Sequence, residues 1–272
     1  MDIDGTLTNS RKKITPETRK ALLQAQNDGA LLVLASGRPV SGIMDYAVEL
    51  EMDRHHGLIV AFNGSKVIDC QTGEVLFNET LTVEEGRAVL EHMKKFDVHP
   101  MIDRGDYLYV NDAWPAQRRW DHPEMNIVEF EVHAGHFKVC EIEDLAAFAD
   151  FPLNKILNAG EPEYLQAHYQ EMEAPFRGKL NAMFTAPVFF EFTSLGVDKA
   201  KALDAVLRPM GFEPEDMIAF GDSDNDRSMV EYAGTGVAMD NAVPDLKEAA
   251  DVITGSNDED GIVPALNAFL SR

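Results

Sequence analysis

Residues 1–8 read Met-Asp-Ile-Asp-Gly-Thr-Leu-Thr, which places two carboxylates one residue apart and follows them with a glycine and a hydroxyl. Carboxylate and hydroxyl oxygens are the kind of ligand that Mg²⁺ prefers in proteins. The same pair suits covalent phosphoryl transfer, in which one carboxylate attacks phosphorus and the other moves protons. The alternative is an acidic turn, because Asp-Gly is common in turns. The stretch favours a catalytic loop in which Asp2 and Asp4 are the reactive carboxylates.

A second acidic loop follows the apolar run of residues 217–220 and contains Asp222, Asn225 and Asp226. The run is typical of a buried strand, and open α/β sheets bind ligands just beyond the carboxyl ends of their strands. The spacing does not fit a helix–loop–helix calcium site, which needs a bidentate acid at its twelfth position. The loop therefore indicates a metal site, with a solvated turn as the alternative.

Two further segments lie between these loops in the sequence. The apolar run of residues 31–34 ends in Ala-Ser-Gly-Arg, where Ser36 and Arg38 could grip phosphate oxygens. Lys199 lies near the start of an amphipathic stretch, and its ammonium could neutralise a phosphoryl group. Each signal alone has an ordinary alternative, a strand-ending turn for Ser36 and a solvated surface lysine for Lys199.

Taken in order, the four segments resemble the four motifs of the haloacid dehalogenase superfamily, phosphotransferases built on a doubly wound sheet. Residues 60–65, 236–242 and 249–254, with Asp260-Gly261-Ile262, resemble more narrowly the Cof-type sugar-phosphate phosphatases of that superfamily. The resemblance covers residues 2–66 and 191–266, and the middle of the chain lacks recognisable motifs.

This resemblance implies a role for each matched residue. Asp2 is expected to be the nucleophile that forms an aspartyl phosphate, and Asp4 the acid and base. Ser36 and Lys199 are expected to bind the transferring phosphoryl group. Mg²⁺ is expected to be held by the Asp2 carboxylate, the Asp4 backbone carbonyl and Asp222. The remaining expected site residues are Asn225 and Asp226 in support of the metal, and Arg38, Asn63 and Gly64 in contact with substrate.

Alternation of helical and strand-like runs predicts an α/β fold with a doubly wound, mainly parallel sheet. Thr-Pro-Glu at residues 15–17 is typical of a helix start. Residues 81–187 differ, because helical runs are set among short alternating runs typical of an antiparallel α+β domain. We therefore predict a core domain in two parts, 1–80 and 188–272, and an inserted domain, 81–187. In the family resembled, an insertion at this place is the cap that determines substrate specificity.

The first motif departs from the family in one respect, because only Met1 precedes Asp2, whereas the nucleophile normally follows a central strand. Loss of a central strand would leave two strand edges unpaired, at a cost of about one hydrogen bond per residue. We therefore expect a further segment upstream of Met1.

The composition of the chain argues against several classes of binding partner and indicates a cellular compartment. The net charge of −23 disfavours nucleic acid and anionic lipid, which bind basic surfaces. No run approaches the roughly 18 apolar residues of a membrane helix. Two cysteines in 272 residues argue against a disulfide framework and favour a reducing compartment, so we expect a cytoplasmic protein.

The sequence thus predicts a Mg²⁺-dependent phosphatase for a small-molecule phosphate ester, with sugar phosphates as the expected class. It is expected to be a monomer or weak homodimer. The alternatives are a phosphomutase of the phosphomannomutase type and a non-catalytic phosphosugar-binding module. The intact set of Asp2, Asp4, Ser36, Lys199 and Asp222 argues against the binding module.

Overall fold

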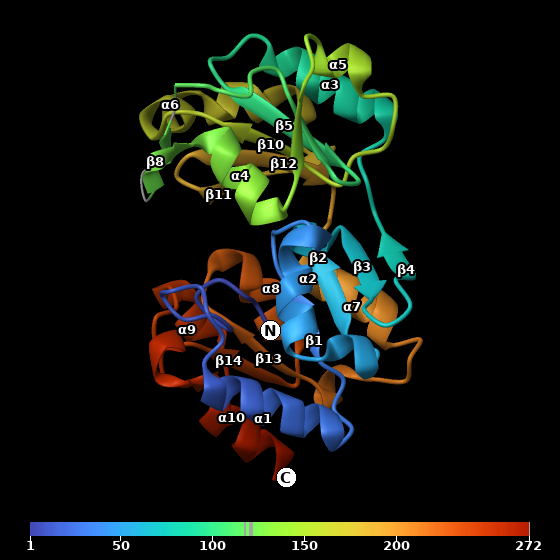
Figure 1. The fold of residues 1–272 in the computed structure, drawn as a ribbon, viewed down its shortest axis with the longest axis vertical. Coiled ribbons are helices and arrows are strands. Elements are labelled where there is room, and N and C mark those ends of the chain that lie inside the picture. Colours follow the sequence, from blue (N-terminus) through green and yellow to red (C-terminus); the bar gives the residue numbers. More distant parts are fainter. Residues whose placement is uncertain (117, 120–121, 272) are drawn as a thin grey trace. The chain divides into compact units, whose positions relative to one another are not determined.

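The computed structural model describes residues 1–116, 118–119 and 122–271, and it divides into two compact units. Unit 1 comprises Met1–Phe77 and Asp198–Arg272, and unit 2 comprises Asn78–Val197. Figure 1 shows unit 1 in blue to cyan and in orange to red, and unit 2 from teal through green and yellow to the amber strands β11 and β12. No helix within the described part of the chain is both long and apolar enough to span a membrane.

Unit 1 contains two short sheets, one from each of its chain segments. Their order is β1-β2-β3-β4 and β13-β14-β15. The strands are β1 (Val33–Ala35), β2 (Leu58–Ala61), β3 (Lys66–Asp69), β4 (Val75–Asn78), β13 (Ile218–Gly221), β14 (Thr235–Ala238) and β15 (Val252–Ile253). β1 pairs in parallel with β2, and β13, β14 and β15 are parallel, whereas β2 and β3 are antiparallel.

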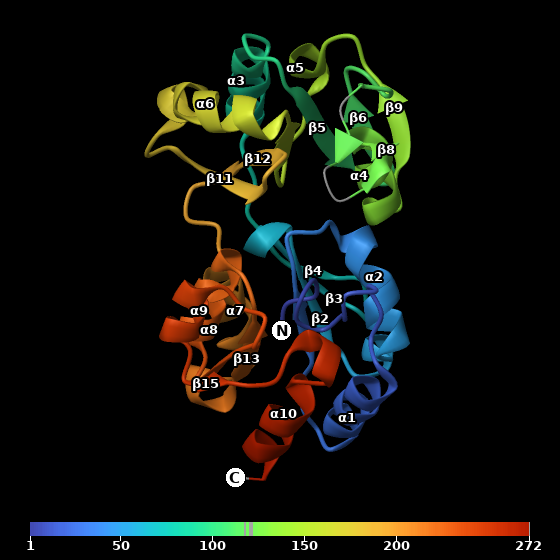
Figure 2. The ribbon, with the colours of Figure 1, turned by 90° about the vertical axis from the view of Figure 1, so that its left-hand side faces the viewer.

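Helices cover both faces of these sheets. They are α1 (Pro16–Asn27), α2 (Val40–Glu49), α7 (Lys199–Leu207), α8 (Arg227–Tyr232), α9 (Pro244–Ala249) and α10 (Ile262–Leu270). One apolar cluster joins α1, α2 and α10 to the strands, and another joins α7 and α8 to the opposite face. α1 and α10 lie side by side (Figures 1 and 2). The predicted doubly wound α/β fold is confirmed.

The first residues of the chain connect the two sheets of unit 1. The amino group of Met1 donates to the carbonyl of Val33 (2.9 Å), and the N–H of Ala35 donates to the carbonyl of Met1 (2.9 Å). On the other side, the N–H of Asp2 donates to the carbonyl of Phe220 (3.0 Å). The N-terminus accordingly lies between β1 and β13 in Figure 1, and the two sheets form one layer at this point.

Unit 2 is an α+β arrangement around a six-stranded sheet of order β11-β12-β10-β5-β6-β9. Its strands are β5 (His99–Arg104), β6 (Tyr107–Val110), β9 (Lys138–Glu141), β10 (Ile156–Ala159), β11 (Leu180–Ala186) and β12 (Phe189–Ser194), with a separate pair β7 (Arg118–Arg119) and β8 (His122–Asn126). Its helices are α3 (Val83–Met93), α4 (Ile127–Gly135), α5 (Leu145–Phe148) and α6 (Pro162–Glu173). Apolar side chains of α3, α5 and α6 pack on one face of the sheet, and those of α4 pack on the other.

The second boundary of this unit differs from the predicted residue 187. The unit continues to Val197 because β12 pairs antiparallel with both β10 and β11, which places it within the sheet of unit 2. α6 is followed directly by a 3₁₀ turn at Ala174–Phe176.

Candidate active site

Three loops of unit 1 meet at one edge of the sheet layer. They follow Met1–Asp2, β1 and β13, and the backbone bonds of Met1 and Asp2 to β1 and β13 hold the three loops together. Carboxyl ends of neighbouring parallel strands share an edge of the sheet, and this is where the predicted site residues lie.

Lys199 is the centre of the site. Its side chain has no exposed surface, and its Nζ donates to Asp2 Oδ1 (2.7 Å), Asp226 Oδ1 (2.6 Å) and the carbonyl oxygen of Ala35 (2.8 Å). An ammonium has three N–H donors, so each has a partner. Burial alone would lower the pKa of Lys199, but the charges of the two carboxylates raise it, and the side chain is a permanent cation.

The position of Lys199 depends on the first turn of α7. Asp198 is the N-cap of this helix, and its side chain accepts from the N–H of Lys201 (2.9 Å). The carbonyl of Asp198 packs against Gly64, whose φ is +106° and where a Cβ would overlap that carbonyl. Gly64 thus allows the start of α7 to approach the loop after β2. Its predicted substrate contact stays a prediction.

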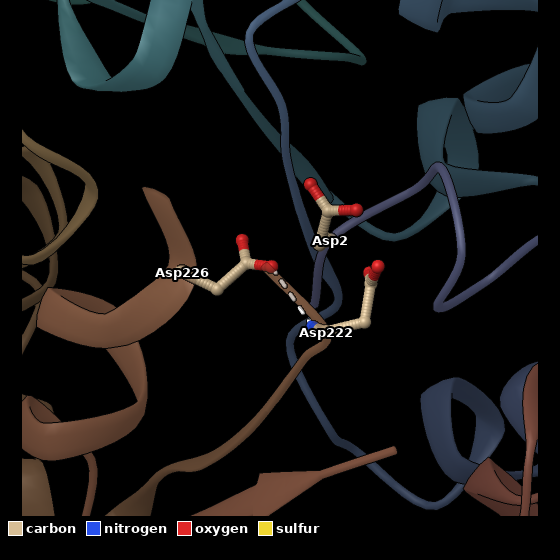
Figure 3. Close-up of side chains that lie close together, drawn as sticks. All are labelled: Asp2, Asp222 and Asp226. Atoms are coloured by element: carbon tan, nitrogen blue, oxygen red, sulfur yellow. Dashed lines mark hydrogen bonds between the residues drawn. The ribbon is translucent and has the colours of Figure 1, made fainter. Parts of the chain in front are cut away.

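Three carboxylates gather beside this ammonium, those of Asp2, Asp222 and Asp226 (Figure 3). One ligand oxygen from each lies within 4.8 Å of the others. Burial, and after it the charge of Asp226, raises the pKa of Asp2 to about 8 against the opposing effect of Lys199. Burial likewise raises the pKa of Asp222 to about 6. When ionised, the three carboxylates and Lys199 sum to two negative charges, so the cluster fits a hard divalent cation.

The two acids from the β13 loop have different surroundings. Asp226 is fully buried, and its Oδ1 accepts from Lys199 while its Oδ2 accepts from the N–H groups of Asp222 and Ser223 (3.0 Å each). Asp222 accepts at Oδ1 from the hydroxyl of Thr6 (2.7 Å) and at Oδ2 from the hydroxyl of Ser223 (3.1 Å). Asp226 therefore shapes the loop, and Asp222 keeps acceptor capacity for a cation.

Gly5 makes the close approach of the first loop to Asp222 possible. Its φ is +91°, and a Cβ at this position would overlap the Asp222 carboxylate. The carbonyl of Gly5 accepts from Asn241 Nδ2 (2.8 Å), which fixes the turn from a third loop. The glycine of the first motif thus serves both the turn and the approach of the two acidic loops.

The side chain of Asp4 lies outside the carboxylate cluster and is paired with two cations. Arg38 donates from Nε to Asp4 Oδ2 (2.6 Å) and from Nη2 to Oδ1 (2.8 Å), and Lys12 Nζ donates to Oδ1 (2.8 Å). Burial would raise the pKa of Asp4, but the hydrogen bonds and charges of Arg38 and Lys12 lower it to about 2. Asp4 is therefore a carboxylate here.

The other predicted residues surround this centre. Ser36 is buried, and its Oγ accepts from the N–H of Arg38 (3.2 Å) while its hydroxyl proton stays available for another acceptor. Asn225 Nδ2 donates to Asn63 Oδ1 (2.9 Å), which joins the loop after β13 to the loop after β2. The N–H of Asn63 in turn donates to the carbonyl of Ser36 (3.0 Å). Asn63 and Asn225 thus connect the loops, and their predicted contacts with substrate or metal stay predictions.

Sequence reasoning did not assign a role to Lys12, Ser223 or Asn241. Lys12 has a left-handed backbone (φ 57°) that turns its side chain back toward Asp4 in the same loop. A lysine eight residues after Asp4 carries no pattern that points to this pairing. The role of Ser223 could have been predicted, because it directly follows Asp222 in an acidic loop where a hydroxyl can orient a carboxylate.

Comparisons with known proteins agree with the geometry. The family model of haloacid dehalogenase-like hydrolases matches residues 1–266. A 5-amino-6-(5-phospho-D-ribitylamino)uracil phosphatase of Bacillus subtilis is 31% identical over 272 residues, covering 99% of this chain and 94% of that protein. Among solved structures, a haloacid dehalogenase-like hydrolase from Bacteroides thetaiotaomicron has a TM-score of 0.88 and 34% identity, covering 98% of this chain and 97% of that one.

A sugar phosphatase of haloacid dehalogenase subclass IIB is similar as well, with a TM-score of 0.77, 26% identity and coverage of 98% and 96%. The predicted resemblance to the superfamily and to its Cof-type branch is confirmed, as is the phosphatase class of enzyme. The buried Lys199 between Asp2 and Asp226, the acidic loop of Asp222 and the match over residues 1–266 lead to one conclusion: the chain belongs to the haloacid dehalogenase-like hydrolases.

Proposed function

We propose that this protein is a Mg²⁺-dependent phosphatase that hydrolyses small phosphorylated metabolites, sugar phosphates foremost, through an aspartyl phosphate on Asp2. The observation that carries the proposal is the buried group in which Lys199 contacts Asp2 and Asp226 beside Asp222. It combines a nucleophile, a fixed cation and an oxygen-lined position for a divalent cation. The sugar-phosphate class rests on the similarity to the subclass IIB sugar phosphatase.

The first step is attack on phosphorus by the Asp2 oxygen that Lys199 does not hold. An electron pair of this oxygen forms the new P–O bond as the bond to the leaving sugar oxygen breaks, and Asp4 gives that oxygen a proton. The hydroxyl of Ser36 offers an O–H donor to an equatorial phosphoryl oxygen, and the positive charge of Lys199, held beside Asp2, offsets the negative charge that the phosphoryl group carries.

The second step releases phosphate and restores the enzyme. Asp4, now a carboxylate, takes a proton from a water molecule, and the water oxygen attacks phosphorus. The bond between phosphorus and Asp2 breaks, and its electron pair returns to the Asp2 carboxylate. Water is consumed, and an alcohol and inorganic phosphate are the products.

Asp2 and Asp222 are the side chains that would hold Mg²⁺, because both keep acceptor capacity, and burial, with the added charge of Asp226, raises the pKa of each. A bound cation supplies charge neutralisation for the phosphoryl group. The backbone carbonyl of Asp4 and the side chains of Asn225 and Asp226 are further candidates. Asp226 already has partners on both oxygens, so we assign it to positioning Lys199 and the loop.

The test is release of inorganic phosphate from a panel of sugar and nucleotide phosphates, with and without Mg²⁺. We expect turnover of at least one sugar phosphate with Mg²⁺, none in excess chelator, and recovery when Mg²⁺ is restored. Ca²⁺, which is larger and less strict in geometry, should inhibit. Undiminished turnover in excess chelator by protein that contains no metal would contradict the metal assignment.

A matched pair of variants locates the cation. Asp222→Asn removes one anionic oxygen from the cluster, and the Mg²⁺ concentration for half-maximal activity should rise by at least about tenfold. Asp224→Asn is the control, because Asp224 is an exposed acid in the same loop and outside the cluster. An equal Mg²⁺ requirement in the Asp222→Asn protein and the control would show that Asp222 is not a ligand.

We assign Arg38 to positioning Asp4 rather than to contact with substrate. Its two bonds to Asp4 are backed by a third from Nη1 to the carbonyl of Gly42 (3.3 Å) and by the ring of Tyr46 under its guanidinium. Arg38 thereby fixes the orientation of the acid and base. Because Asp4 is ionised in this pairing, the pairing must loosen before Asp4 protonates a leaving group.

We therefore expect Arg38→Gln to lower kcat for a sugar phosphate by about 100-fold with little change in KM. Turnover of p-nitrophenyl phosphate should fall far less, because nitrophenolate leaves without a proton. Arg54→Gln is the control, since Arg54 is an exposed arginine paired with Glu51. Equal losses for both substrates would show that Arg38 contacts the phosphoryl group itself.

A further inference from the structure

The loop that carries Asp4 is bound by a second segment of unit 1, residues 256–260, which we call the strap. The strap contains the 3₁₀ turn Asn257–Glu259 and is followed by α10. Its side chains bind the stretch between Asp4 and α1, although the two segments lie near opposite ends of the sequence. Such a connection can fix a reactive side chain that lies on a loop.

Two side chains of the strap bind the backbone that follows Asp4. Asn257 Nδ2 donates to the carbonyl oxygen of Thr8 (2.8 Å). Asp258 Oδ1 accepts from the N–H of Ser10 (2.8 Å). The strap therefore holds the backbone of this stretch at two places that are two residues apart.

Asn241, from the loop after β14, extends the connection to Gly5. The N–H of Asn257 donates to Asn241 Oδ1 (3.0 Å), and Asn241 Nδ2 donates to the carbonyl oxygen of Gly5 (2.8 Å). A backbone N–H can only donate and a carbonyl can only accept, so these partners fix the orientation of the Asn241 amide. Asn257 thus holds the turn of residues 5–8 at both ends, directly at Thr8 and through Asn241 at Gly5.

The same turn is joined to the carboxylate cluster from its other side. The hydroxyl of Thr6 donates to Asp222 Oδ1 (2.7 Å), and the N–H and hydroxyl of Thr8 donate to the carbonyl of Ile3 (2.9 and 3.0 Å). Gly5, at φ +91°, is the residue of this turn with the greatest conformational freedom. Because Gly5 directly follows Asp4, a bond that fixes the Gly5 carbonyl also restricts the backbone of Asp4.

The strap also holds the turn that brings Lys12 to Asp4. The N–H of Asn9 donates to the carbonyl of Lys13 (3.0 Å), and the N–H of Lys12 donates to the carbonyl of Asn9 (2.9 Å). This turn places Lys12 Nζ at 2.8 Å from Asp4 Oδ1. Ser10, the residue that Asp258 binds, belongs to the same turn.

We propose that Asn257 is a positioning residue for Asp4, with Asn241 as the relay between them. The inference rests on the proposed function, in which Asp4 moves the protons. Asp2 is held differently, by Lys199 and by the bond from its N–H to the carbonyl of Phe220. Loss of the Asn257 amide should therefore slow proton transfer by Asp4 and leave attack by Asp2 nearly unchanged.

The test uses p-nitrophenyl phosphate, because nitrophenolate leaves without a proton and only hydrolysis of the aspartyl phosphate then needs Asp4. Rapid mixing with saturating Mg²⁺, followed by acid quenching, measures the rate constants of phosphorylation and of hydrolysis separately. In Asn257→Ala, hydrolysis should slow by about tenfold while phosphorylation stays within about twofold of the parent. Asn241→Ala, a change at an exposed residue, should slow hydrolysis selectively as well.

Thr18→Val is the matched control, because it removes a bond at the far end of the same strap. The Thr18 hydroxyl donates to Asp260 Oδ1 (3.1 Å), and Thr18 is a buried residue of α1. The change should lower Tm, yet both rate constants should stay within about twofold of the parent, since Thr18 is remote from Asp4.

Equal slowing of both steps in Asn257→Ala, or no slowing of either, would overturn the inference and leave the proposed function in place. Selective slowing of hydrolysis in Thr18→Val as well would overturn it too, because the effect would then belong to the strap as a whole. Turnover of the parent protein without covalent phosphate would contradict the proposed function itself, and the inference with it.

Discussion

The Asp2→Asn variant should lose at least about 1,000-fold in kcat while remaining folded, because the amide cannot attack phosphorus or form a stable covalent intermediate. Phosphate release from a sugar phosphate measures the loss. Asp53→Asn is the matched control, since Asp53 is an exposed acid of unit 1 outside the site. Activity of the Asp2→Asn protein within about tenfold of the parent would rule out nucleophilic attack by Asp2.

The fold should survive this change for an electrostatic reason. Burial and the charge of Asp226 raise the pKa of Asp2, so its carboxylate is held in surroundings that disfavour the charge. Asparagine has the same shape and keeps an oxygen that accepts from Lys199. Circular dichroism and Tm close to those of the parent should therefore accompany the loss of activity.

Lys199→Met should have the second largest effect, and it should act on both stability and turnover. The change leaves the Asp2 and Asp226 carboxylates without their shared cation in a buried site. Removal of one member of a buried ionic group costs about 3–5 kcal/mol, because a charge remains without a partner. Urea unfolding measures this cost, and kcat should fall by at least about 100-fold with the loss of the positive charge beside Asp2.

Lys201→Met is the control for this variant, because Lys201 lies on the same helix and is exposed. Its free energy of unfolding should stay within about 0.5 kcal/mol of the parent. A Lys199→Met protein as stable and as active as the control would contradict the central place given to Lys199.

Much of the site could be predicted because it depends on strand ends. Ser36 and Asp222 each follow a short apolar run, and parallel strands bring their carboxyl ends to one edge of a sheet. The direction of Lys199 follows from its place in the first turn of α7, where an N-cap aspartate fixes the helix start. Strand ends and helix caps depend on a few neighbouring residues and not on exact side-chain positions, so the pattern of residue types is sufficient to predict them.

Side-chain pairing between loops could not be predicted in the same way. The predicted substrate contact of Arg38 stays a prediction, and its two hydrogen bonds to Asp4 did not follow from the sequence. That choice depends on the rotamer of Arg38 and on the turn at Lys12, neither of which follows from residue type. Gly64 and Asn63 are similar, because their contacts with Asp198 and Asn225 arise from close approach of distant segments.

Unit 2 ends at Val197, whereas the sequence pattern predicts the end of the inserted domain at residue 187. The chain reverses between β11 and β12, which form an antiparallel pair. Phe190 and Phe192 of the second strand pack with the helices of unit 2. Apolar runs alone do not say which sheet a strand joins, so the boundary at Val197 required the pairing.

The central claim is that Asp2 carries phosphate during turnover, and acid quenching of the reaction tests it most directly. The protein is mixed with a ³²P-labelled sugar phosphate and Mg²⁺, quenched in acid within milliseconds, digested and analysed by mass spectrometry. The account predicts acid-stable, hydroxylamine-sensitive phosphate on the peptide that contains Asp2, and none in the Asp2→Asn protein. Phosphate on any other residue, or turnover with no covalent phosphate at any quench time, would contradict it.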